Sequence, residues 1–166
     1  MSEKIEFKNI QISKEDLNRI LDAGMMSPTA KSLQPQKIYV VESQNGLKKL
    51  KDLTNYYAPT ALIVCGNIEQ SYKKNYYVSY KSDCILVSLH MILEATYLGI
   101  DNLYFTNIDL MDKLEKEFEL GINNRPVSLI FLGYKTDDSL GFKASDFNCN
   151  LLPKYKKNKE DIVKNI

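Results

Sequence analysis

The amino-acid sequence predicts a single α/β (α+β) domain over residues 1–166, in which helices flank a central mixed sheet. Three observations support this prediction. A chain of 166 residues has the length of one domain. Short runs of β-branched and aromatic residues alternate with segments of helical period. Residues 83–99 are apolar around the whole circumference of a helix, which predicts a long, buried central helix.

The first elements are an extended arm and an amphipathic helix. Residues 1–11 carry few apolar side chains, which is typical of an arm. Ser13 begins the helix with Asp16 three residues later, as in a capping box. Pro28 cannot continue a helix, so the helix ends before it.

Two strands and a short helix follow. Residues 38–41 and 61–65 are unbroken apolar runs and indicate buried strands. Between them, Ser43 or Asn45 caps a helix with an apolar inner face. Residues 66–82 are polar and rich in tyrosine, and we expect an irregular excursion with some helix there.

The second half begins with the central helix, which we expect to be covered on every side, with a second subunit as an alternative burial partner. The chain's single histidine, His90, lies in it and is interpreted as a core residue rather than a catalyst. Residues 103–105 indicate a short strand, Asp109 caps the next helix, and residues 127–134 form a last strong strand.

Composition excludes several classes of function. Lys plus Arg number 22 and Asp plus Glu number 21, so a net charge of +1 gives no electrostatic case for nucleic acid or an acidic membrane. No stretch approaches a membrane span, and the N-terminus lacks an apolar signal region. The three cysteines fit neither a disulfide framework nor a metal site. We therefore expect a cytoplasmic protein that binds no metal.

One loop has the features of a ligand site. Pro28 and Pro35 each push the preceding residue out of the helical region, so we expect an extended, pre-set backbone between them, with small and polar side chains and a buried strand directly after it. A rigid polar loop on a helix-to-strand connection is a common way to hold a ligand. The alternative is an ordinary connection between two elements.

The standard catalytic constellations are missing. The sequence has no glycine-rich phosphate loop, no nucleophile elbow and no histidine placed to activate a serine or cysteine. We predict no catalytic side chain. A chain this poor in reactive groups either performs no chemistry or takes it from a cofactor.

Read as a whole, the sequence resembles the nitroreductase family of FMN-dependent oxidoreductases, and its small single-domain bacterial members most. Four segments carry the resemblance in family order: ISKEDLNRILDAGMMSPTAKSLQPQKIYVVES, YYAPTALIVC, DCILVSLHMILEATYLGI and VSLIFLGYKTDD. They are similar to the family's first helix with its flavin loop and strand, a second strand entry, the central helix and the last core strand.

The resemblance implies a homodimer that binds FMN in clefts made by both subunits and passes electrons from NAD(P)H to a nitroaromatic, quinone or similar acceptor. By resemblance, one group of residues lies along the flavin ring and ribityl chain, a second covers the other face of the ring, and C-terminal lysines stand near the phosphate. These groups are Thr29, Ala30, Ser32 and Gln34; Tyr104, Phe105 and Thr106; and Lys156, with Lys154 or Lys157 as alternatives.

One departure from the family pattern leaves a second hypothesis open. Family members usually begin with an arginine-rich motif that grips the FMN phosphate, whereas this chain begins Met1-Ser2-Glu3-Lys4-Ile5. Lysines could replace the arginines as point charges. Alternatively, the protein is a nitroreductase-like dimer that has lost flavin binding and serves as a binding or interaction protein.

Overall fold

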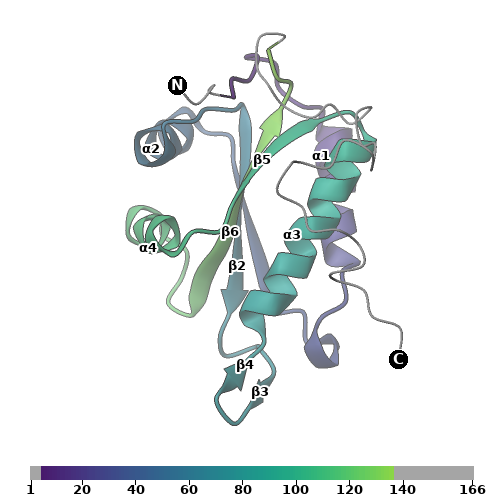
Figure 1. Ribbon diagram of the computed structural model, residues 1–166, viewed down its shortest axis with the longest axis vertical. Coiled ribbons are helices and arrows are strands. Elements are labelled where there is room, and N and C mark those ends of the chain that lie inside the picture. The colour runs from purple at the N-terminus through teal and green to yellow at the C-terminus, as the bar shows by residue number, and fades with distance from the viewer. Residues whose placement is uncertain (1–4, 137–166) are drawn as a thin grey trace, which may run out of the picture.

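The computed structural model describes residues 5–136. Its main sheet has four strands in the order β1-β2-β6-β5 (Figure 1). Their bounds are β1 Gln36–Val41, β2 Thr60–Asn67, β5 Asp101–Phe105 and β6 Asn124–Gly133. The α+β class is confirmed, but the described strands pair only antiparallel rather than as a mixed sheet. β2 and β5 do run in the same direction, because a helix connects them, but β6 lies between them and is antiparallel to both.

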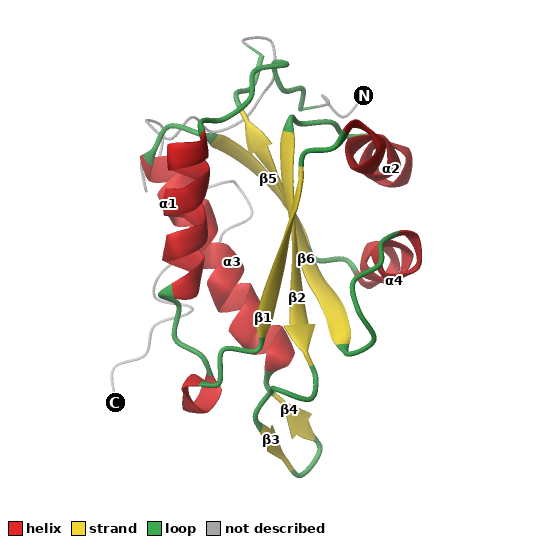
Figure 2. Ribbon diagram, turned by 180° about the vertical axis from the view of Figure 1, so that it is seen from behind, coloured by secondary structure: helices red, strands yellow, loops and turns green. Residues whose placement is uncertain are grey.

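Helices cover both faces of this sheet. The four α-helices are α1 Lys14–Met25, α2 Gln44–Thr54, α3 Tyr80–Tyr97 and α4 Ile108–Glu117. Seen from behind, α1 and α3 lie together on one side of the sheet, while α2 and α4 lie on the other (Figure 2). The molecule is therefore a three-layer sandwich.

Capping side chains begin two of the four α-helices described. Ser13 caps α1, because its hydroxyl accepts the Asp16 N–H at 3.0 Å. Ser43, rather than Asn45, caps α2 in the same way. The prediction for α4 was wrong by two residues: Asn107 is the N-cap, and Asp109 lies in the first turn. A carboxylate in a first turn is favoured by the helix dipole, which explains why the cap and first-turn positions were confused.

The segment between β2 and α3 also differs from the prediction. It forms a two-stranded hairpin of β3 (Lys73–Lys74) and β4 (Tyr77–Val78), and helix α3 begins at Tyr80, three residues before the predicted start. Asn75 adopts the left-handed conformation, with φ of 54°, that a tight hairpin turn requires. The hairpin projects from the end of the sheet where α3 starts (Figure 1).

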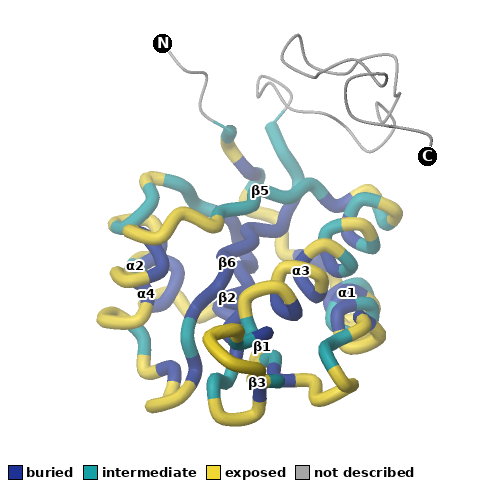
Figure 3. The backbone as a smooth tube through the Cα atoms, turned by 60° about the horizontal axis from the view of Figure 1, so that its bottom comes forward, coloured by how far each residue is buried: buried dark blue, intermediate teal, exposed yellow. Residues whose placement is uncertain are grey.

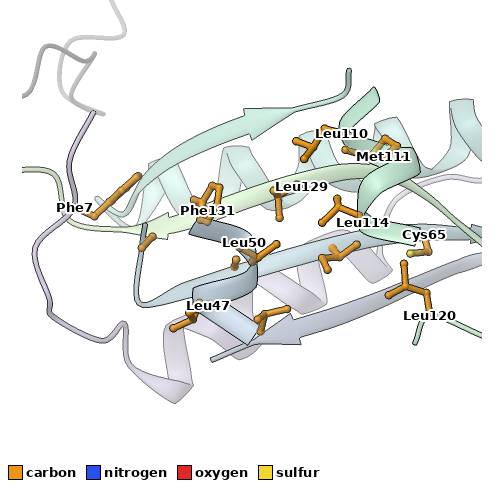
Figure 4. Close-up of a cluster of buried hydrophobic side chains, with 14 residues drawn as sticks. Phe7, Leu47, Leu50, Cys65, Leu110, Met111, Leu114, Leu120, Leu129 and Phe131 are labelled. Atoms are coloured by element: carbon orange, nitrogen blue, oxygen red, sulfur yellow. The ribbon is translucent and has the colours of Figure 1, made fainter. Parts of the chain in front are cut away.

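Each face of the sheet has its own hydrophobic cluster. Figure 4 shows the cluster under α2 and α4, where Leu50, Leu114 and Phe131 are fully buried. Phe7 of the predicted arm joins this cluster and forms a bridge to Lys135. The second cluster lies under α1 and α3 and includes Ile20 and Met91.

Packing under α3 is close enough to require glycine at two positions. A Cβ at Gly24 of α1 would lie 2.7 Å from Met91 Cγ, and a Cβ at Gly66 of β2 would lie 2.6 Å from Tyr80 Cβ. Both contacts fix the distance of α3 from its neighbours. The N-terminus of α3 therefore has a well-defined position against the sheet.

The central helix is not covered on every side in the single chain. Its inner residues, such as Val87 and Met91, are inaccessible to solvent, as the tube in Figure 3 shows by its alternating colours along α3. On its outer side, four large apolar residues remain 39% to 52% exposed: Ile85, Leu86, Leu89 and Leu93. His90 is only partly buried and contacts the Leu86 carbonyl through Nδ1 at 2.9 Å, so it is not a core residue as predicted. None of the helices within residues 5–136 has the length and hydropathy needed to cross a bilayer.

Candidate functional site

The loop between α1 and β1 has a strained backbone. The prediction of an extended backbone between the two prolines was wrong: Ala30–Ser32 forms a short 3-10 turn, in which Lys31 has φ of 56° and Ser32 φ of 55°. Gln34 follows with φ of 47°. A non-glycine residue in this left-handed region costs about 1–2 kcal/mol. Three such residues within four positions therefore need compensating contacts, and such strain is concentrated at functional sites in proteins.

Hydrogen bonds at both ends hold the loop in this conformation. The Gln34 N–H donates to Thr29 Oγ1 at 3.0 Å, and the Gln34 side-chain amide donates to the Met25 carbonyl at 3.3 Å. The Ala30 N–H donates to Asp83 Oδ1 of α3 at 2.9 Å. The side chains of Lys31, Ser32 and Gln34 remain exposed. The loop thus presents polar side chains on a fixed backbone.

Two buried polar atoms flank the loop without a hydrogen-bond partner in the part of the chain that the structure describes. They are Ser27 Oγ and Gln36 Oε1. Ser27 is only 3% exposed. A buried polar group without a partner is uncommon because it loses its hydration and gains nothing in return. These two atoms are therefore suited to a ligand or ordered water at this loop.

Tyr104 and Phe105 lie on opposite faces of the sheet, because successive strand residues alternate. Tyr104 faces α3, beside the hydroxyls of Ser88 and Ser128, which are hydrogen bonded to each other at 2.7 Å. Burial raises the pKa of the Tyr104 phenol, and the two neighbouring serine hydroxyls partly oppose the rise. Phe105 faces the other way and packs edge-on against Phe131, with ring centroids 6.1 Å apart.

Thr106 lines a cavity of about 220 Å³ between the first turns of α3 and the start of α4. Tyr80, Lys81 and Ile85 form its wall on α3. Arg125 lies on the opposite side, paired with Glu115. The cavity therefore combines apolar surface with two cationic groups and two carboxylates, since Asp112 and Glu115 line it as well.

The structure brings the four predicted loop residues together but separates the second predicted group, because Tyr104 and Phe105 lie on opposite faces of the sheet and only Thr106 lines the cavity. Thr29, Ala30, Ser32 and Gln34 lie together in the loop, whereas Thr106 lines a cavity that includes none of them. Both groups contact α3, through Asp83 for the loop and through the α3 wall for the cavity. Lys154, Lys156 and Lys157 lie outside the described residues.

Sequence reasoning missed Asp83 and Ser79. Asp83 is 3% exposed, and its second oxygen accepts the Ser79 hydroxyl at 2.7 Å. One signal was present in the sequence: an aspartate heads the most apolar segment of the chain, and buried aspartates are rare unless they are paired or hydrogen bonded.

Comparison with known proteins assigns the chain to a family. The model of the "Nitroreductase family" matches residues 1–56. A protein of Archaeoglobus fulgidus named "Putative NADH dehydrogenase/NAD(P)H nitroreductase" is 30% identical over 148 residues, which are 84% of each chain. A crystal structure of a nitroreductase family protein from Clostridium difficile 630 is 26% identical, with a TM-score of 0.81 over 96% of this chain and 90% of that chain.

A further structure, an FMN-dependent nitroreductase from Clostridium difficile R20291, shares the fold, with a TM-score of 0.69 and 18% identity over 92% of this chain and 93% of that one. The α+β sandwich and the relatives therefore point to the same family. The chain belongs to the nitroreductase family, and this places it among the oxidoreductases.

Proposed function

We propose that this protein is an FMN-dependent oxidoreductase that transfers electrons from NAD(P)H to a small acceptor such as a nitroaromatic or a quinone. The observation that carries the proposal is the strained loop at residues 29–34, flanked by the unpartnered atoms Ser27 Oγ and Gln36 Oε1. The names of two relatives add support, because one contains NAD(P)H nitroreductase and the other states FMN dependence.

The residues of the loop fit the polar edge of a flavin. The flavin's pyrimidine edge and ribityl chain offer both donors and acceptors. Ser27 and Ser32 can donate or accept through their hydroxyls, and Gln34 offers an amide with both functions. Thr29 and Ala30 complete the contact surface on a backbone that is already in place. Binding would then require little ordering of the protein.

The second group of residues would form the opposite side of the cleft. Tyr104 packs on the side of the sheet that faces α3, next to Ser88 and Ser128, and Thr106, two residues further on, lines the cavity. Phe105 supports this strand from the far face of the sheet. For the phosphate, we propose the C-terminal lysines, with Lys156 first among them.

The chemistry that FMN supplies when bound is acceptance of a hydride from NAD(P)H and delivery of electrons to the acceptor. The protein's part in this reaction is to bind and orient the ring and to exclude water. Backbone N–H groups and polar side chains of the loop would stabilise charge that develops on the ring, as preorganised donors do in other enzymes.

We further propose that the protein works as a homodimer through the outer face of α3. Ile85, Leu86, Leu89 and Leu93 recur along one side of the helix, and each leaves about half of a large apolar side chain in solvent. Burying such side chains is worth about 1 kcal/mol for each half side chain covered. Dimerisation around α3 would also bring the loop of one subunit towards the cavity of its partner, which would unite the two groups of site residues.

The experiment is a visible absorption spectrum of the purified protein before and after incubation with FMN and desalting. A bound flavin that bleaches with NADH or NADPH is the expected result. Gln34→Ala should weaken flavin retention, whereas Gln44→Ala, on α2 at the opposite face of the sheet, should not. A folded wild-type protein that stays colourless after incubation contradicts the proposal.

That colourless result would favour the second candidate function, a nitroreductase-like binding protein without flavin. The observation in its favour is the N-terminus, where Glu3 stands in place of the family's arginines and would repel a phosphate. Such a protein would be folded and dimeric but would not oxidise NADH or NADPH.

A further inference from the structure

We propose that Asp83 is a positioning residue, which together with Ser79 holds the loop of residues 29–34 in the conformation that receives the cofactor. The proposal rests on the proposed function for the identity of the ligand. The hydrogen bond between the loop and Asp83 is present in the chain without any ligand. Neither residue contacts the exposed loop side chains that we assign to flavin binding, so both act through the backbone of Ala30.

The contacts of Asp83 account for both of its oxygens. Oδ1 accepts the Ala30 N–H at 2.9 Å, and Oδ2 accepts the Ser79 hydroxyl at 2.7 Å. None of the ion pairs that the structure describes includes Asp83. An almost fully buried carboxylate is unfavourable unless hydrogen bonds replace its hydration. Its position in the first turn of the 18-residue helix α3 also favours a negative charge.

Ser79 extends the hold to a third segment. Its hydroxyl accepts the Tyr72 N–H at 3.1 Å, and its own N–H donates to the Tyr72 carbonyl at 3.0 Å. Tyr72 immediately precedes the hairpin of β3 and β4. One buried pair therefore joins the loop, the start of α3 and the base of the hairpin.

The internal bonds of the loop do not set its position on the molecule, and of its two bonds to other segments, that of Gln34 goes to the adjoining helix α1 and only that of Ala30 goes to α3. The Ser32 N–H donates to the Thr29 carbonyl, and the Leu33 N–H donates to the Ala30 carbonyl, so both bonds stay within the loop. They determine the shape of the turn but not its position relative to the sheet and α3. The Ala30–Asp83 bond connects that turn to the helix whose other side forms the cavity of Thr106. Asp83 thus sets the position of the loop relative to the rest of the candidate site.

The test compares Asp83→Asn and Asp83→Ala with the wild type in two independent measurements. The first is amide hydrogen exchange of residues 29–34 in flavin-free protein. The second is FMN affinity, measured by titration. The amide oxygen of asparagine can still accept the Ala30 N–H, whereas alanine leaves both partners unsatisfied. We therefore expect faster loop exchange and weaker FMN binding in both variants, with the larger effect in Asp83→Ala. The loss of FMN affinity in Asp83→Ala should be about tenfold to hundredfold.

Asp101→Asn is the matched control. Asp101 also accepts a backbone N–H from a distant segment, that of Lys135 at 2.9 Å, but at the opposite end of the sheet. Its substitution should leave the exchange of residues 29–34 unchanged. Ser79→Ala serves as a second test variant if Asp83→Ala does not fold, and should accelerate exchange in the loop and around Tyr72 together.

The outcomes separate the two proposals. Unchanged loop exchange in Asp83→Ala, or exchange that rises equally throughout the chain as stability falls, overturns the positioning role. A wild-type protein that binds no FMN overturns the proposed function, and the exchange measurement then still decides whether Asp83 holds the loop. Wild-type FMN affinity in Asp83→Ala overturns the positioning role alone.

Discussion

The close contact between β2 and the first turn of α3 leads to a sharp prediction for Gly66→Ala. The added methyl would lie 2.6 Å from Tyr80 Cβ and 2.8 Å from Cδ2. Carbon atoms in contact are separated by about 3.5–4.0 Å, so the shortfall is about 1 Å. Rotation of the tyrosine ring cannot relieve it, because Cβ is attached directly to the helix backbone. The start of α3 must therefore move away from the sheet.

Overpacking of this kind typically costs about 1–3 kcal/mol of unfolding free energy. For a domain of this size, that loss corresponds to a fall in Tm of about 2–12 °C. Denaturant and thermal unfolding of Gly66→Ala measure the loss directly. Because Tyr80 is three residues before Asp83, we also expect faster exchange of the Ala30 amide.

A double-mutant cycle with Tyr80→Gly provides the control, since that change removes the atom at 2.6 Å. Gly66→Ala should cost clearly less in the Tyr80→Gly background than in the wild type. Equal costs in the two backgrounds would show that the contact with Tyr80 does not limit the distance between α3 and the sheet, and would refute the reasoning.

Four further predictions concern the thiols, Phe105 and the outer face of α3. Burial raises the pKa of Cys65 and of Cys84 to about 12, so at pH 8 only about one thiol in 10⁴ is ionised, and a Cys149→Ser variant should resist alkylation until it is denatured. The pKa of these thiols is 9.0 in the unfolded chain and about 12 in the folded one, so the thiols should leave the free energy of unfolding unchanged below pH 9 and lower it as the pH rises towards 12. Unfolding curves at several pH values measure this change. Phe105→Ala should lower the unfolding free energy by about 2 kcal/mol, less than for a fully buried ring, since its half-buried ring packs against Tyr56 and Phe131; an unchanged denaturation midpoint would mean that these contacts do not contribute to stability. Leu89→Glu should yield a monomer in size-exclusion chromatography with light scattering, whereas Ile122→Glu, at an exposed residue before β6, should not; a dimeric Leu89→Glu would place the interface elsewhere.

Elements with local signals could be predicted from the sequence. The capping residues Ser13 and Ser43 begin α1 and α2, and the apolar runs after residues 37 and 60 are strands. These signals act within a few residues, so one sequence is sufficient to read them. The same holds for the loop, whose boundaries at Pro28 and Pro35 are fixed by proline itself.

What could not be predicted depends on contacts between distant segments. Ala30 and Asp83 are 53 residues apart, and no local pattern indicates that a buried carboxylate accepts a loop N–H. The left-handed backbone of Lys31 was equally unpredictable, because lysine has no preference for that region and adopts it only when tertiary contacts compensate. What covers the outer face of α3 also stayed open, because an apolar helix surface does not reveal whether the same chain or another covers it.

The left-handed residues of the loop have a consequence for engineering the protein. Glycine adopts this backbone region without steric cost, so Ser32→Gly would relieve about 1 kcal/mol of strain, partly offset by the greater freedom of glycine in the unfolded chain. A search for thermostable variants would therefore tend to select glycine at residues 31, 32 and 34. Such variants would lose the side chains that face the candidate site. This loop is where selection for heat tolerance and selection for turnover are expected to oppose each other most directly.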